Sequence, residues 1–185
     1  MNPDESDDEE PALEDAAAVN FDAILVRCCE EFSGGVVTGS GEPGVVAQLF
    51  SGLLAENPAN CLAFCDSIRT AFVEAGEKEG FRTADDFPAG AGGALHEVTL
   101  MKVGFLIQGV NERKEKELKS LPADGRLRLY DQCVADLHEA ESYLPWVLKC
   151  ERKGWLSIIR NLRSACEKAA GRLRRQFRTA PGTRR

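Results

Sequence analysis

The chain has 185 residues, of which 43% are hydrophobic, so it is long enough for one domain with a sizeable apolar core. It contains no apolar run of 18 residues, and its start is acidic, so the sequence predicts neither a transmembrane helix nor a signal peptide. The net charge of -7 is uneven: the first 15 residues carry eight carboxylates and no basic residue, whereas residues 149–185 carry twelve Lys or Arg and two Glu.

The seven cysteines are an odd number and include no CxxC pair. Without a secretory signal, this usage predicts reduced and mostly buried thiols in a cytosolic or nuclear protein. Cys61 and Cys65 share one helix face, but two thiols without a nearby pair of histidines favour packing over metal binding. We therefore predict no metal site and no cofactor.

The N-terminal third predicts a tail and three helices. Residues 1–17 are acidic and lack apolar periodicity, which predicts a disordered tail. Asn20 is a candidate cap for a helix over residues 21–32, which Gly34 and Gly35 end. Apolar residues at helical spacing predict a second helix over 45–54, and a third that begins at Asn57-Pro58 and carries its apolar stripe from Cys61 to Val73.

The middle of the chain predicts one central helix. Residues 76–94 are rich in glycine, so we expect at most one short helix there. Residues 95–110 are apolar on nearly every face, which is typical of a helix surrounded by others; a buried strand is the rival interpretation. The charged residues 111–119 continue this helix, and Pro122 and Gly125 are expected to break it.

Two amphipathic helices are predicted in the last third, over residues 127–144 and 155–177. The segment between them contains both tryptophans, as Pro145-Trp146 and Gly154-Trp155. We expect it to form a polar joint in which Gly154 adopts a backbone conformation that other residues avoid. The whole chain thus divides into an acidic tail (1–17), an all-α domain (18–178) and a basic disordered tail (179–185).

No pattern of catalytic residues is present. The sequence lacks HExxH, a Walker loop and GxSxG, and its two histidines are His96 and His138. His96 begins the apolar helix, where a hydrogen-bonded structural role is favoured over a ligand role. The sequence therefore predicts a protein that is not an enzyme.

The basic C-terminus could contact nucleic acid or anionic lipid through its arginines. A solvated helix end is the favoured interpretation, because the cluster is short and lacks interleaved aromatic residues. We therefore do not expect nucleic acid as a partner.

The segment Leu144–Val147, followed by Gly154-Trp155, resembles the second homology motif of the Bcl-2 family of apoptosis regulators. Residues 99–110 lie where the first motif and the central helix of that family would lie, and residues 55–68 and 21–32 are similar to earlier helices. The sequence departs from the family at three motifs. Lys153 replaces one glycine, the Asn-Trp-Gly-Arg of the first motif is absent, and so is the Leu…Gly-Asp of the third motif.

This resemblance implies a Bcl-2-like bundle of seven to eight helices around a central apolar helix. It also implies a groove that binds amphipathic pro-death helices of Bcl-2 family partners and so favours survival. The groove would be lined by Leu49, Leu53, Phe64, Phe72 and Phe105. By position, Lys102 would stand for the family's arginine and pair with a ligand carboxylate, without the planar fork of an arginine. Pro145, Trp146, Gly154 and Trp155 would form the structural motif beneath the groove.

The chain ends in arginines and shows no C-terminal anchor, which is expected of a virus-type or invertebrate-type member. The resemblance implies a cytoplasmic protein, with peripheral contact to the mitochondrial outer membrane. Three alternatives stay open: a pro-death member of the same fold, an unrelated all-helical adaptor, and a nucleic-acid binder that uses the basic tail. The missing Gly-Asp makes the pro-death role the weaker of the two family roles.

Overall fold

The computed structural model describes residues 19–33, 58–118 and 120–179, and this part of the chain is all-α, without strands. It contains five α-helices: α1 (Phe21–Ser33), α3 (Pro58–Lys78), α4 (Ala89–Glu112), α5 (Ala123–Ser142) and α6 (Lys149–Thr179). Three short turns connect them: the 3-10 helices η1 (Ala84–Asp86) and η3 (Leu144–Trp146), and the π-helix η2 (Arg113–Glu117). The predicted helix over 45–54 and both predicted tails lie outside the described residues, so the count of seven to eight helices stays a prediction.

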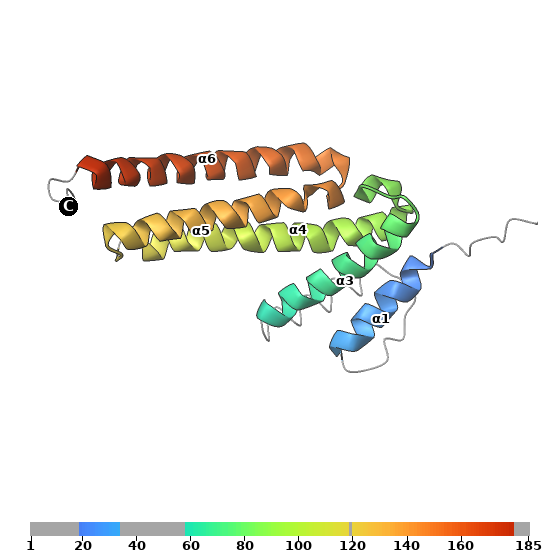
Figure 1. Ribbon diagram of the computed structural model, residues 1–185. Helices are drawn as coiled ribbons and strands as arrows, with labels where there is room; N and C mark the ends of the chain where they lie inside the picture. The colour runs from blue at the N-terminus through green and yellow to red at the C-terminus, as the bar shows by residue number, and fades with distance from the viewer. Residues whose placement is uncertain (1–18, 34–57, 119, 180–185) are drawn as a thin grey trace, which may run out of the picture.

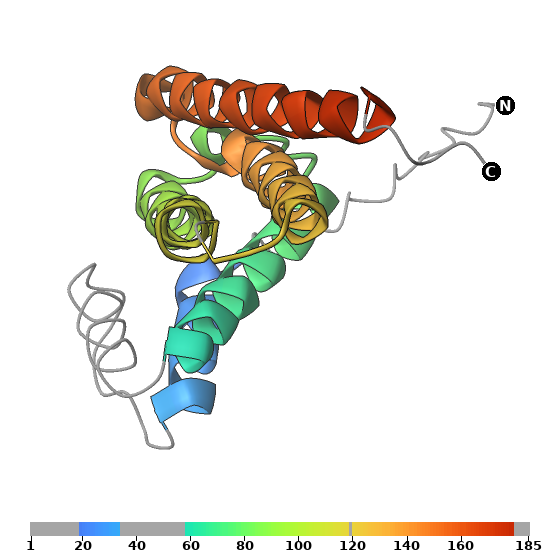
Figure 2. The same ribbon diagram turned by 90° about the vertical axis from the view of Figure 1, so that its left-hand side faces the viewer.

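The helices lie in three layers (Figure 1): α6 on the outside, then α4 and α5, and then α1 and α3. Helices α1 and α3 slant away from one end of α4. The same layers are visible from the side in Figure 2. Helix α6 packs along α5, whereas α3 packs on both α1 and α4. Helix α4 therefore lies between the N-terminal helices and α5.

Helix α4 contributes to two separate apolar cores. Its N-terminal half places Leu95 and Val98 in the first core, with side chains of α1, α3 and η1. Its C-terminal half places Val103 and Val110 in the second core, with side chains of α5, η3 and α6. The prediction of a central helix is confirmed, and the rival strand interpretation is wrong.

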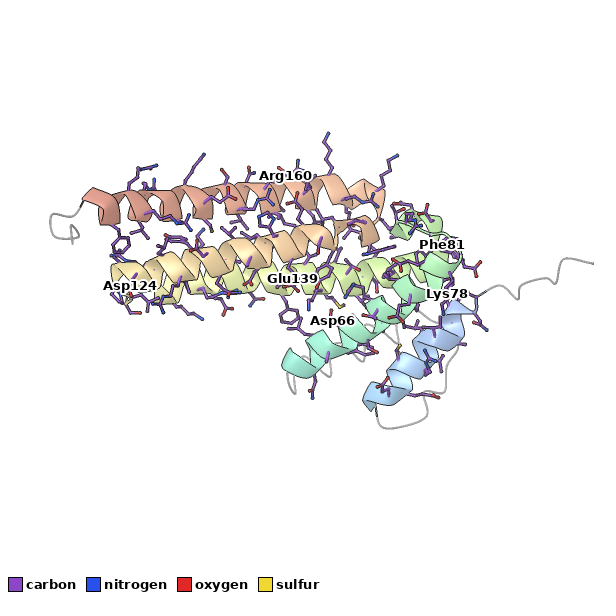
Figure 3. All side chains as sticks on the ribbon, in the orientation of Figure 1. Asp66, Lys78, Phe81, Asp124, Glu139 and Arg160 are labelled. Carbon is purple, nitrogen blue, oxygen red and sulfur yellow. The ribbon has the colours of Figure 1, made fainter. Side chains whose placement is uncertain are left out.

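The first core contains a cluster of aromatic rings near one end of the molecule, where Phe81 is labelled in Figure 3. The Phe21 ring lies 5.4 Å from that of Phe72 and 5.1 Å from that of Phe87, and Phe81 meets Phe87 edge-on at 4.9 Å. Trp146 of η3 packs edge-on against Phe87 at 6.3 Å. The cluster thus ties α1, α3 and η3 together.

Two helix ends follow from local sequence. Asn20 caps α1, because its Oδ1 accepts the Ala23 N–H at 3.0 Å, as predicted. Gly80 ends α3 with φ = +81°, which brings the Phe81 N–H within 2.8 Å of the Gly76 carbonyl oxygen. This glycine-dependent cap turns the chain so that Phe81 reaches the aromatic cluster.

The prediction for residues 76–94 is wrong in extent, although η1 is a short helix of the kind expected there. Helix α3 runs to Lys78, and α4 already begins at Ala89, so the glycines at 90, 92 and 93 are helical. A Cβ atom on Gly92 would lie 2.6 Å from the Ala84 carbonyl oxygen. Close packing of α4 against η1 therefore requires glycine there and outweighs the low helix propensity of the segment.

The predicted joint after Trp146 is also wrong in extent. Helix α6 begins at Lys149, so Gly154 lies within a helix instead of in a left-handed turn. Similarly, Gly125 lies inside α5, which begins directly after Pro122. Charged side chains and isolated glycines were misread as breaks, although a helix anchored by packing on one face tolerates both.

Most predicted features of the thiols are confirmed. Six of the seven cysteines are buried, and Cys150 is exposed. Burial raises the pKa of Cys29 to about 11 and that of Cys65 to about 12, so these thiols stay protonated at neutral pH.

None of the described helices has the length and apolar character needed to span a bilayer.

The two helical glycines give a matched test of the packing. Gly92→Ala should lower the free energy of unfolding by about 1–3 kcal/mol, because its methyl group meets backbone. Gly154→Ala should raise it by about 0.5–1 kcal/mol, because the new methyl group meets no atom within 4 Å and alanine favours a helix. Urea unfolding followed by circular dichroism measures both. A destabilising Gly154→Ala would instead support a glycine-specific joint.

Thiol labelling tests the burial of the cysteines. At pH 7 an aromatic disulfide reagent should modify one thiol of the folded chain rapidly, Cys150, and all seven only after denaturation. Cys150→Ser should remove the fast phase and leave the slow phases unchanged. Fast labelling of two or more thiols in the native protein would contradict this burial.

Candidate functional site

A network of charged side chains forms where α3, α4 and α5 meet. The Lys102 Nζ on α4 lies 2.7 Å from the Asp66 Oδ2 on α3 and 3.9 Å from the Glu139 Oε1 on α5. The Tyr143 hydroxyl, just beyond α5, donates a hydrogen bond to the Glu139 Oε1 at 2.8 Å. Figure 3 labels Asp66 and Glu139 in this region, where α3 crosses the α4–α5 pair.

The Tyr143 ring packs against two cations of this network. The Arg69 guanidinium lies 4.6 Å from the ring centroid and the Lys102 Nζ lies 5.8 Å from it, both within cation–π range. Burial, together with the hydrogen bond to Glu139, raises the pKa of Tyr143 to about 12. We call Asp66, Arg69, Lys102, Glu139 and Tyr143 the charged network.

The cations of the network are less exposed than its carboxylates. The side chains of Lys102 and Arg69 are 13% and 20% exposed, whereas those of Asp66 and Glu139 are 37% and 45% exposed. The Asp66 Oδ1 and the Arg69 Nε are buried without a hydrogen bond, although they lie 3.7 Å apart as an ion pair. The two cations are therefore largely covered, one Asp66 oxygen is buried, and Glu139 is the most exposed charged side chain of the network.

The residues predicted to line a groove fall into three groups. Phe64 and Phe72 are 0% and 1% exposed and belong to the first core. Phe105 is half-buried on α4 and joins neither core formed by the described residues. Leu49 and Leu53 lie outside the described residues. The structure thus places Phe105 and Lys102, one helical turn apart, on the same helix.

Phe105 belongs to a partly open strip of α4. Met101 and Gly104 are also half-buried, and a Cβ atom on Gly104 would meet no atom within 4 Å. Gln108 continues the strip and is exposed. Because these positions recur at three- and four-residue spacing, they share one side of the helix. We call Met101, Gly104, Phe105 and Gln108 the α4 strip.

The Pro145-Trp146 segment is a structural clasp. Pro145 lies in the first turn of η3. Trp146 packs on the first core, and Trp155 packs on the second. The Arg152 Nη2 donates to the Asp85 Oδ2 at 2.9 Å and to the carbonyl oxygens of Pro145 and Val147 at 3.0 and 2.8 Å. This arginine therefore fixes the start of α6 to η1.

His96 completes the clasp and has a structural role, as predicted. Its Nδ1 accepts the Leu148 N–H at 3.2 Å, and its Nε2 lies 3.5 Å from the Glu151 Oε1. The histidine thus satisfies a backbone amide at the start of α6. Among the described residues, no group of three or more His, Cys, Asp or Glu side chains is placed to hold a metal ion.

Three arginines of α6 pair with carboxylates of α5. Arg160 and Arg163 both pair with Glu141, and Arg174 pairs with Asp131 at 2.5 Å. A shallow surface hollow near the end of α6 is lined by residues of both charge signs: Glu167, Lys168, Gly171, Arg172 and Arg175. The hollow thus carries three basic side chains and one carboxylate.

Sequence reasoning found Lys102 but missed its partners. Asp66 and Arg69 are three residues apart on α3, and Glu139 and Tyr143 four residues apart, so each pair could have been placed on one helix face. Their convergence on Lys102 depends on how three helices cross, which no local spacing encodes. Asp85 and Arg152 were missed for the same reason.

Scans against protein-family models, curated proteins and solved structures find no significant match to this chain.

The charged network makes a prediction for stability. Lys102→Met should lower the free energy of unfolding by about 1–3 kcal/mol, because Asp66 and Glu139 lose the cation that they share and Asp66 keeps only the longer pair with Arg69. Adding Asp66→Asn should restore part of this loss, as a double-mutant cycle measures. Lys116→Met is the control, because that side chain is 74% exposed and should change the free energy by less than about 0.5 kcal/mol. Equal effects of the two lysine variants would contradict a structural role for the network.

Proposed function

We propose that this protein is an interaction module that binds an amphipathic partner helix along the α4 strip. The observation that carries the proposal is Phe105, a large apolar side chain that lies half-buried beside the open side of Gly104 and outside both cores of the described residues. A partner helix would bury Phe105 and Met101 against its own apolar face. The charged network at the edge of the strip would supply polar contacts that fix the partner's orientation.

Two further features support helix binding by α4. Helix α4 carries no charged residue between Glu97 and Glu112 apart from Lys102, which pairs with Asp66 in the charged network. The two flanking cores hold α4 rigidly, so the strip would not have to become ordered when a partner binds. Binding a helix would therefore cost this protein little conformational entropy.

For the biological role, we propose regulation of apoptosis, most simply by sequestering amphipathic pro-death helices. The support is the resemblance of the Pro145-Trp146 and Gly154-Trp155 segment to the Bcl-2 family, together with an apolar helix followed by an amphipathic one. Two observations count against a close relationship: α6 is continuous across Gly154, and Phe64 and Phe72 are core residues. The survival-promoting role is preferred to the pro-death role because the charged η2 turn, Arg113–Glu117, separates the two helices that would have to insert into a membrane.

Calorimetric titration with a panel of amphipathic helices from pro-death Bcl-2 family ligands tests the proposal. At least one helix should bind with a Kd of about 1 μM or tighter. Phe105→Glu should weaken that binding by at least about tenfold, because it places a charge in the apolar contact.

Phe177→Glu is the matched control, because Phe177 is 41% exposed on α6, away from the α4 strip. Circular dichroism and melting curves must show that both variants stay folded. If no helix of the panel binds the folded protein, or if both variants bind equally well, the α4 strip is not the binding surface.

A further inference from the structure

We propose that the binding site on α4 selects partner helices that carry a basic side chain, and disfavours those that carry a carboxylate, next to the charged network. This inference rests on the proposed function and reverses the charge preference that the resemblance implied for Lys102. The reason is the difference in exposure between the cation and the carboxylates of the network, because a ligand meets the exposed charges first.

Lys102 is already neutralised within the chain. Its Nζ lies 2.7 Å from the Asp66 Oδ2 and faces the Glu139 Oε1 and the Tyr143 ring, and only 13% of its side chain is exposed. A ligand carboxylate could reach this ammonium only by displacing Asp66, which would leave the Asp66 carboxylate without its closest cation. The exchange of one carboxylate for another offers the ligand little net gain.

Glu139 is the accessible carboxylate of the network. Its side chain is 45% exposed, and its Oε1 accepts the Tyr143 hydroxyl. Asp66 is less available, because its Oδ1 is buried and its Oδ2 lies 2.7 Å from the Lys102 Nζ. A guanidinium or ammonium of a partner helix would thus meet the Glu139 carboxylate, whereas a ligand carboxylate would meet like charge.

Negative charge also surrounds the α4 strip. Glu97 and Glu112 are exposed at its two ends, one before Met101 and one after Gln108. The cations in this region are paired or covered: Arg69 lies against the Tyr143 ring, Arg113 pairs with Asp136, and Lys116 is 74% exposed but pairs with Glu112 at 3.8 Å. The field along the strip is therefore set mainly by carboxylates, and it should steer basic partners toward the site.

Three synthetic amphipathic helices test the selection. Each has about 20 residues, long enough to populate a helix, and the same apolar face, and they differ only in carrying Arg, Gln or Glu at one position beside that face. Calorimetric titration at low salt should give affinities in the order Arg, Gln, Glu, with about a tenfold difference between the first and the last. Higher salt should reduce that difference, because the carboxylates are partly exposed.

Two charge-removing variants locate the effect. Glu139→Gln should reduce the preference for the Arg peptide by about threefold while keeping the acceptor for Tyr143. Glu167→Gln removes the same charge from α6, where Glu167 faces Arg163, and should leave the preference unchanged. Circular dichroism confirms that each variant is folded.

The outcomes separate the two proposals. Tighter binding of the Arg peptide that Glu139→Gln weakens supports the selection. Equal affinities, or tighter binding of the Glu peptide, overturn the selection while leaving helix binding intact. If none of the three peptides binds the folded protein and Phe105→Glu changes nothing, helix binding itself fails and the selection fails with it.

Discussion

The burial of α4 in two directions is the constraint on which the rest of this structure depends. One half of the helix buries Leu95 and Val98 against α1 and α3, and the other half buries Val103 and Val110 against α5 and α6. A helix that is apolar on nearly every face cannot be covered by one neighbour, so the chain supplies helices on both sides. Because the first core covers one half of α4 and the second core the other, part of its surface near the changeover is left only partly covered.

The charged network lies at this changeover, where α3 stops covering α4. A lysine on the apolar helix would be costly to bury alone, and carboxylates from α3 and α5 offset that cost. The same arrangement leaves the Glu139 carboxylate partly exposed to solvent. The polar contacts that stabilise the helix crossing therefore also determine the electrostatic character of the surface that we propose binds a partner.

Much of the fold could be predicted from local patterns, and the errors share one cause. The cap at Asn20, the central helix and the helix after Pro122 each follow from side chains close in sequence. The glycine-rich start of α4 was missed because Gly92 is explained by its packing against the Ala84 carbonyl group of η1 and not by the helix to which it belongs. Of the candidate site, Lys102 could be predicted, but its partner Asp66 lies 36 residues away and was missed. Contacts between helices are set by packing that local spacing does not encode.

The ion pair between Asp85 and Arg152 has a consequence for the order in which the chain folds. These residues are 67 positions apart, and their contact requires α4 and α5 to have formed and turned back on each other. Closing so long a loop costs entropy that only the packed hairpin can offset. The start of α6 should therefore join the native structure late, after the α4–α5 pair, so that a nascent or truncated chain would display the bare flank of α5 before α6 covers it.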